Sequence, residues 1–133
     1  MPVSYEIFKE MKLIVSHQTG HTDDDEIMRV YKAMYADPDF DPSYDKLIDL
    51  READSRGRDP DVLEIMAHFA DEKYSEIQTK PKVAIIAPKD LTFGFGRMYD
   101  GMSAKTGEDL QVFRTAADAC NWLEIDPDFL DLD

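Results

Sequence analysis

Basic residues are scarce in this sequence. Its 133 residues include 15 Lys and Arg against 29 Asp and Glu, which gives a formal net charge of −14. Proteins that bind nucleic acid or an anionic membrane depend on Lys and Arg patches, and the basic residues here form no run. We therefore expect neither nucleic acid nor an anionic membrane as a partner. The hydrophobic content of 43% is typical of a folded domain and exceeds that of a disordered acidic chain.

Cysteine is also scarce. Cys120 is the single cysteine and has no second thiol for an internal disulfide, which favours a reducing compartment. The N-terminal sequence MPVSYEIFKEMK lacks the basic and then apolar segments of a signal peptide. No apolar run reaches the roughly 20 residues that span a bilayer. We expect a cytoplasmic protein.

The sequence lacks the common motifs that indicate catalysis or cofactor binding. In residues 94–101, Tyr99 stands where a dinucleotide fingerprint needs its third glycine, and no Gly-Lys-Ser/Thr completes a P-loop. Residues 37–48 begin like a calcium loop, but Pro42 and Ile48 replace the required Gly and Glu. Neither a Cys/His motif nor Gly-x-Ser-x-Gly is present. We predict a protein that is not an enzyme and that has no cofactor and no metal site.

The sequence does contain a regular alternation of strand and helix patterns. Strands are expected at residues 3–8 and 11–17 (a hairpin with Lys9-Glu10 between its strands), and at 44–50, 83–87 and 110–113. Helices are expected at about 23–36, 59–78, 91–106 and from residue 116 onward. This order predicts one α/β domain over residues 1–133, with a mixed, largely parallel sheet of about five strands and about four helices. An acidic C-terminal tail follows from about residue 125.

Local signals predict where the elements begin and end. Gly20 is expected to break the chain after the hairpin, and Thr22 with Asp25 resembles a capping box for the first helix. Asp59-Pro60 is a typical helix start, and Thr115 is a typical cap for the last helix. In the 59–78 helix the buried face is predicted to carry four apolar side chains, Val62, Ile65, Met66 and Phe69. The glycines of the 91–106 helix favour close packing of that helix on the sheet or on a partner.

The polar segment after the 44–50 strand is the first candidate site. Ser55 lies in the loop that leads to the next helix, preceded by Asp54 and flanked by Arg56 and Arg58. Ligands of α/β sheets bind at the carboxyl ends of strands. A phosphoryl group on Ser55 would gain from a nearby helix N-terminus and from guanidinium groups. An ordinary polar loop is the alternative.

The 91–106 helix is the second candidate site. Aromatic and Met side chains recur along it around one arginine, and the candidate residues are Phe93, Phe95, Arg97, Met98, Tyr99 and Met102. They are predicted to form either a surface for a partner or the lining of an apolar pocket beneath the helix. Such a stripe also suits an ordinary core.

Three segments resemble a known family. Residues 44–55 (YDKLIDLREADS), 83–102 (VAIIAPKDLTFGFGRMYDGM) and 110–124 (LQVFRTAADACNWLE) look like the STAS-like domains related to sporulation anti-sigma-factor antagonists. Residues 94–98 and 119–123 are the most specific parts, and the resemblance covers nearly the whole chain. It implies a STAS-like fold, in agreement with the order of elements predicted above.

The resemblance also implies a function. In the antagonists an Asp-Ser pair at the start of a helix is the phosphorylation site, and Asp54-Ser55 is similar to it, although Arg-Gly-Arg-Asp follows in place of a small apolar helix start. The implied role is a non-catalytic regulatory or protein-interaction domain that contacts a protein partner or a second copy of itself, as a homodimer. The related CRAL-TRIO-like group implies the alternative, a domain that binds a small apolar ligand or a lipid.

Overall fold

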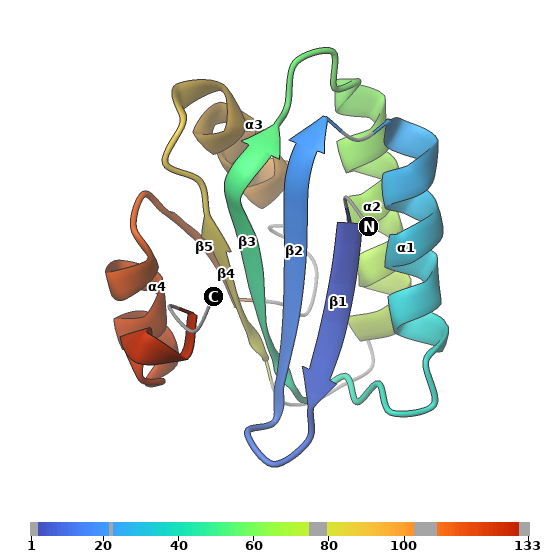
Figure 1. Cartoon of the computed structure of the whole chain (residues 1–133). Coiled ribbons are helices and arrows are strands. Elements are labelled where there is room, and N and C mark those ends of the chain that lie inside the picture. Colours follow the sequence, from blue (N-terminus) through green and yellow to red (C-terminus); the bar gives the residue numbers. More distant parts are fainter. Residues whose placement is uncertain (1–2, 22, 75–79, 103–108, 131–133) are drawn as a thin grey trace.

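A five-stranded sheet with the strand order β1-β2-β3-β4-β5 organises the chain (Figure 1). The computed structural model describes residues 3–21, 23–74, 80–102 and 109–130. The strands are β1 (Val3–Phe8), β2 (Leu13–His21), β3 (Asp45–Asp54), β4 (Lys82–Ile86) and β5 (Asp109–Phe113). β1 runs antiparallel to β2, and all other neighbours are parallel. The predicted α/β domain with a mixed, largely parallel sheet and an N-terminal hairpin is confirmed.

In the described part of the chain, three helices cover one face of the sheet, and one short helix with a 3₁₀ turn covers the other. α1 (Asp24–Ala36), α2 (Pro60–Tyr74) and α3 (Asp90–Met102) connect β2 to β5 in turn. Because the strand order follows the chain order, right-handed crossovers place all three helices on the same face. α4 (Ala116–Leu123) and the 3₁₀ helix η1 (Pro127–Leu130) pack on the opposite face (Figure 1).

The hairpin differs from the prediction at its turn and at the end of β2. Four residues, 9–12, connect the strands, and the amides of Met11 and Lys12 donate to the carbonyls of Phe8 and Lys9. A φ of 53° at Lys12 closes this longer turn, so the predicted two-residue turn was wrong. β2 also continues through Gly20 to His21, because pairing with β3 holds this stretch in the sheet.

β3 runs four residues beyond its predicted end and carries a bulge. His17 pairs with Asp49 and Thr19 pairs with Glu52, so β3 has one more residue than β2 over this stretch. The bulge allows the Asp49 carboxylate to accept a hydrogen bond from the backbone N–H of Arg51 at 3.1 Å. Arg51, Glu52 and Asp54 interrupt the hydrophobic pattern, so this part of the strand was not predicted.

The helix starts largely agree with the prediction. Asp23 caps α1, since its carboxylate accepts from the Glu26 amide at 2.8 Å; Thr22, the predicted capping residue, lies outside the described residues. α2 begins at Pro60 as predicted, with the Asp59 carboxylate accepting from the Asp61 amide. The predicted ends of the second and third helices, near residues 78 and 106, also lie outside the described residues.

The predicted buried face of α2 was wrong at Ile65. Leu63, Ala67 and Ala70 are buried against the sheet, whereas Ile65 is exposed. Two alanines on the inner face allow a close approach of the helix to the sheet, and this rotates Ile65 outward. The remaining three predicted residues, Val62, Met66 and Phe69, are half-buried.

α3 lies close to the sheet at one glycine. A Cβ atom on Gly96 would stand 3.1 Å from Val112 Cγ1 and 3.3 Å from Val112 Cγ2, whereas one on Gly94 would meet nothing within 4 Å. The predicted close packing of a glycine-containing helix on the sheet is thus confirmed at Gly96. Gly94 faces away from the sheet.

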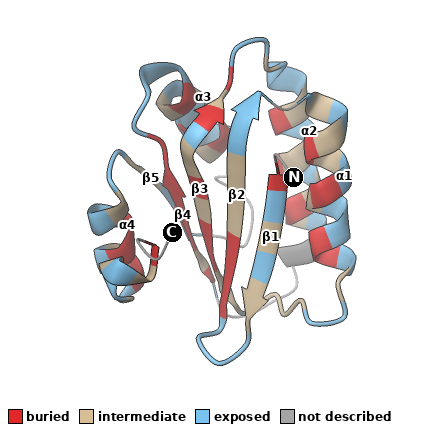
Figure 2. Ribbon diagram, viewed as in Figure 1, coloured by how far each residue is buried: buried red, intermediate tan, exposed pale blue. Residues whose placement is uncertain are grey.

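The second face of the sheet is covered by the C-terminal part of the chain. Thr115 caps α4 as predicted, and Cys120 is buried in the core between α4 and the sheet. Within the stretch expected as an acidic tail, residues 127–130 form η1, and Leu130 is buried. Buried residues gather in the central strands and on the inner sides of the helices (Figure 2). None of the helices in the described ranges is long and apolar enough to cross a membrane.

Candidate functional site

A cavity of about 90 Å³, here called the main cavity, lies between the sheet and the helices that cover it. Its apolar walls come from β3, β4, α2 and α3, and include Ile48, Leu50, Leu63, Met66, Val83, Ile85 and Phe95. A neighbouring space of about 60 Å³, the side cavity, extends toward β1 and α1. The two share six lining residues, among them Gln18, Tyr31 and Lys46, so they form adjoining parts of one site.

Lys46 projects from β3 into both cavities and is only 3% exposed. Its Nζ donates a hydrogen bond of 2.7 Å to the Tyr35 hydroxyl and lies 5.0 Å from the centre of the Tyr35 ring. Transfer of an ammonium group out of water is costly unless polar groups receive it. The hydroxyl and the π face of Tyr35 both stabilise this buried cation.

A chain of tyrosine hydroxyls continues from Lys46 across the helices. The hydroxyl oxygen of Tyr31 lies 3.1 Å from that of Tyr35 and 3.3 Å from that of Tyr99. The Tyr31 hydroxyl is also placed to donate to the Met66 carbonyl at 3.3 Å. Each tyrosine hydroxyl can donate and accept, so either hydroxyl can be the donor in the Tyr31–Tyr35 and Tyr31–Tyr99 contacts. The hydroxyl chain therefore joins β3, α1, α2 and α3 at the edge of the main cavity.

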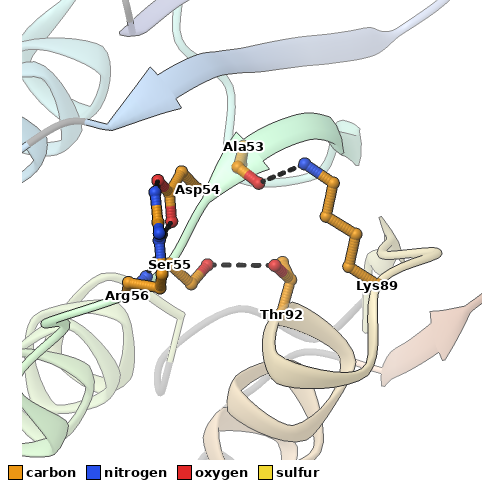
Figure 3. A network of polar contacts seen from close by, with 6 residues as sticks. All are labelled: Ala53, Asp54, Ser55, Arg56, Lys89 and Thr92. Atoms are coloured by element: carbon orange, nitrogen blue, oxygen red, sulfur yellow. Dashed lines mark hydrogen bonds and ion pairs between the residues drawn. The ribbon is translucent and has the colours of Figure 1, made fainter.

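Ser55 and Thr92 form the polar wall at the other end of the main cavity. Ser55 directly follows β3, Thr92 lies in the first turn of α3, and their buried hydroxyls are 3.1 Å apart. Lys89 reaches across the same gap and donates to the Ala53 carbonyl at 3.2 Å. Figure 3 shows the Ser55 and Thr92 side chains pointing toward one another between the two elements. These contacts tie α3 to the end of β3.

The charged side chains around Ser55 pair with neighbouring residues rather than with the Ser55 hydroxyl. Arg56 forms an ion pair of 2.6 Å with Asp54, and its side-chain and backbone hydrogen bonds hold the pKa of the Asp54 carboxyl well below its usual value (Figure 3). Arg58 is largely buried and meets Asp24 of α1 at 2.6 Å. Phosphorylation of Ser55, which stays a prediction, would require its hydroxyl to leave Thr92.

The structure separates the predicted α3 residues into two groups. Phe95 and Tyr99 line the main cavity together with Thr92 and Gly96. Met98 and Arg97 are exposed on the outer side of α3. Phe93 is half-buried, with the Arg114 guanidinium carbon 4.0 Å from its ring centre. The side chain of Met102 lies outside the described residues.

Several cavity residues were missed from the sequence. Lys46 had the clearest signal, since a charged residue within the apolar run YDKLIDL is a candidate buried polar group. Tyr31 and Thr92 occupy ordinary helical positions, and nothing in the sequence links them to Lys46 or to Ser55. Ser55, Arg58, Phe95 and Tyr99 were predicted, but as members of two separate sites.

A second polar cluster lies on the opposite face of the sheet. Asp49 is buried and accepts hydrogen bonds from Arg51 at 2.9 and 3.0 Å, and its carboxylate lies 3.1 Å from His17 Nδ1. Burial raises the pKa of Asp49, but the Arg51 hydrogen bonds and the Arg51 and His17 charges outweigh it and lower the pKa. Arg51 also donates to the Leu130 carbonyl, so this cluster fastens η1 to the sheet.

No metal centre is evident in the part of the chain that the structure describes. No group of three or more His, Cys, Asp or Glu side chains there converges in a way that would hold an ion. The acidic loop at residues 37–45 instead uses its carboxylates to accept local backbone hydrogen bonds, as Asp37 does from Asp39 and Asp41 does from Ser43.

Comparison with known proteins gives a fold. Neither a family model nor a curated protein matches the sequence. The structure is similar to the crystal structure of an uncharacterized protein of the DUF3478 family with a SpoIIAA-like fold from Shewanella loihica, with a TM-score of 0.54, 20% sequence identity and 91% of each chain covered. The chain has a SpoIIAA-like fold. This is the STAS-like fold that the sequence resemblance implied, and at this identity the SpoIIAA-like neighbour supports the fold alone.

Proposed function

We propose that this SpoIIAA-like domain is a non-catalytic regulatory domain that binds a small molecule in the main cavity. The observation that carries the proposal is an apolar cavity under α2 and α3 with polar groups at both ends, Lys46 at one and Ser55 with Thr92 at the other. Small-molecule sites are typically apolar hollows with a few convergent polar groups. This cavity has that composition.

The position of the cavity allows a bound ligand to affect the surface elements around it. A ligand in contact with Phe95 and Tyr99 bears directly on α3, and the Ser55–Thr92 and Lys89–Ala53 hydrogen bonds connect α3 to the end of β3. Occupancy then biases the position of α3 and of the loop after β3 together. A regulatory domain needs such a link between a ligand and a surface that a partner contacts.

The chemistry of the lining supports binding rather than catalysis. Among the described residues that line the main cavity there is no His, Cys, Asp or Glu. Ser55 is hydrogen-bonded to a neutral threonine, so no base among these lining groups activates it.

Native mass spectrometry of gently purified protein tests this function. We expect wild-type protein to carry a constant additional mass of small-molecule size. Ile48→Phe fills the space where both cavities meet and should lose that mass. Ile65→Phe adds the same bulk on the exposed side of α2 and is the matched control. If Ile48→Phe remains folded and retains the same adduct, the cavity is not the binding site.

A second candidate function is self-association through the outer side of α3, and one observation favours it. Leu91 and Met98 are 48% and 41% exposed, and their separation of seven residues places them on the same side of the helix. A second copy of the chain is the proposed partner. An exposed apolar pair of this kind, two turns apart, is typical of a helix that meets another helix.

The chain contains a matched control for this second function. Met11, in the hairpin turn, is also 41% exposed but lies away from α3. Met98→Glu should convert a dimer to a monomer in light scattering coupled to size-exclusion chromatography, and Met11→Glu should leave it unchanged. A wild-type protein that is monomeric at high micromolar concentration contradicts this candidate.

A further inference from the structure

A serine, a histidine and an aspartate stand in one row across three neighbouring strands, on the face of the sheet opposite the main cavity. Ser4 of β1 pairs with His17 of β2, and His17 pairs with Asp49 of β3. Residues directly opposite each other on antiparallel strands have their side chains on the same face, with Cβ atoms about 4.5–5.5 Å apart. His17 is therefore flanked by a hydroxyl on one side and by a carboxylate on the other.

The carboxylate fixes the orientation of the imidazole. Asp49 Oδ2 lies 3.1 Å from His17 Nδ1, and the two side chains are 7% and 41% exposed, so a buried acceptor holds a partly exposed ring. Arg51 donates two side-chain hydrogen bonds to the same carboxylate and holds it in place. Because an ionised carboxylate only accepts, Nδ1 must carry a proton. In the neutral imidazole Nε2 is then left as an acceptor.

The hydroxyl of Ser4 is free to meet that ring. Ser4 is exposed, and within the described part of the chain its hydroxyl forms no hydrogen bond. Ser4 and His17 both line an open groove of about 310 Å³. A serine beside a histidine that a buried carboxylate orients is the arrangement that activates a hydroxyl for acyl transfer, and it recurs on unrelated folds. Without a bound substrate the contact between serine and histidine is often longer than a hydrogen bond.

The same groove has an apolar part next to Ser4. Its apolar lining comes from β1, β2 and η1 and includes Phe8, Val15, Phe129 and Leu130. Glu6 adds a negative charge to the lining, and the chain as a whole carries −14, so an anionic acyl donor would be repelled. The groove therefore suits an uncharged ester with an apolar acyl group.

We propose that Ser4 is a covalent modification site that accepts an acyl group from an uncharged ester, with His17 as the base. The Ser4 oxygen forms a bond to the ester carbonyl carbon, and its proton passes to His17 Nε2. The bond between that carbon and the alcohol oxygen then breaks, and the alcohol leaves with the proton from Nε2. Asp49 stays ionised and stabilises the imidazolium that forms in between. The products are one acyl group on Ser4 and one free alcohol.

The site is separate from the site of the proposed function. Ser4, His17 and Asp49 line neither the main cavity nor the side cavity. The reaction modifies the chain once and adds no catalytic cycle to a regulatory domain. Failure of either proposal therefore leaves the other in place.

Acylation of the full chain by p-nitrophenyl butyrate tests the proposal. Intact-mass measurement should show the addition of one butyryl group, peptide mapping should place it on Ser4, and Ser4→Ala should abolish it. Ser43 is the internal control, because it is also exposed but its hydroxyl donates to Asp41, and it should stay unmodified. An unmodified chain, or modification of lysines at the same rate as Ser4, overturns the proposal.

Two histidine variants test the role of His17. His17→Asn should slow the acylation of Ser4 on the order of 100-fold, which is a typical contribution of a general base. His68→Asn is the matched control and should leave the rate unchanged, since His68 is also exposed and also meets a carboxylate, that of Glu72 at 3.3 Å, but lies on α2. Equal rates in wild-type and His17→Asn protein overturn the proposal.

The tautomer of His17 tests Asp49 as the positioning residue. Nitrogen NMR shifts of wild-type protein should show the neutral ring protonated on Nδ1, and Asp49→Asn should give a mixture of tautomers together with at least about tenfold slower acylation of Ser4. Circular dichroism establishes that the variant is folded. A neutral His17 protonated on Nε2 in wild-type protein overturns the proposal, because that nitrogen cannot accept the Ser4 proton.

Discussion

The hydroxyls of Ser55 and Thr92 lie 3.1 Å apart, both shielded from solvent, and join the end of β3 to the first turn of α3. Each hydroxyl therefore depends on the other for a hydrogen-bond partner in a place that water reaches poorly. Removal of one partner costs more than the average net value of a hydrogen bond, because the other is left buried.

A double-mutant cycle should reveal this dependence. We expect Ser55→Ala and Thr92→Val each to lower the free energy of unfolding by about 1–2 kcal/mol, and the double variant to lose clearly less than the sum. Urea unfolding provides the measurement, and Ser4→Ala on the exposed side of β1 is the control. Additive losses would mean that the two hydroxyls are not coupled.

Lys46 and Tyr35 should show a similar coupling. Tyr35→Phe removes the hydroxyl that accepts from the Lys46 ammonium, and we expect a loss of about 1–3 kcal/mol in the free energy of unfolding. Lys46→Met removes the ammonium group and keeps the length of the side chain, so the Tyr35 hydroxyl loses this donor. In the Lys46→Met background, Tyr35→Phe should lower the free energy of unfolding by less than it does in the wild-type background. If Tyr35→Phe lowers the free energy of unfolding equally in both backgrounds, the Lys46–Tyr35 hydrogen bond does not contribute to stability.

The two glycines of α3 provide a comparison of packing at one helix. Gly94→Ala has open space and should gain about 0.5–1 kcal/mol from helix propensity. Gly96→Ala brings a Cβ within 3.1 Å of Val112 and should be less stable than Gly94→Ala. In a Val112→Ala background, the difference in stability between Gly94→Ala and Gly96→Ala should largely disappear. Equal stabilities of the two single variants in thermal unfolding would show that α3 does not approach β5 so closely.

Asp49 should contribute to stability in a pH-dependent manner. Its pKa is lowered in the folded state, so its contribution is present above the unfolded value of about 3.9 and is lost as pH falls through the folded pKa. We expect Asp49→Asn to lower the free energy of unfolding by about 2 kcal/mol at pH 7. The difference in the free energy of unfolding between wild type and Asp49→Asn should become smaller as the pH falls from about 5 to about 3. Glu52→Gln, at an exposed position on the same strand, is the control. If this difference in stability stays constant with pH, ionised Asp49 does not stabilise the folded state.

Much of the fold follows from local hydrophobic patterns. β4 was predicted because its apolar residues are continuous and buried on both faces, and β1 was predicted at its observed bounds. The end of β3 was missed because it carries Arg51, Glu52 and Asp54, which a bulge and pairing with β2 hold in the strand. On α2 the buried Leu63, Ala67 and Ala70 were missed and Ile65 was wrongly placed inside, because the spacing of apolar residues alone does not fix which side of a helix faces the sheet.

The candidate site could be predicted only in pieces. Ser55 and the α3 aromatics were identified separately, from loop position and from helical spacing. Their meeting in one cavity depends on how far α3 lies from the end of β3, which no local pattern encodes. Lys46 completes the site from the start of β3, and the direction of its side chain depends on which face of that strand the helices cover.

The position of the small molecule that we expect to co-purify with the protein tests the central claim most directly. Intermolecular NOEs between its protons and methyl-labelled protein should connect it to Leu50, Leu63 and Ile85, which line the main cavity. NOEs confined to the exposed Leu91 and Met98, with none to the three lining residues, would contradict the account.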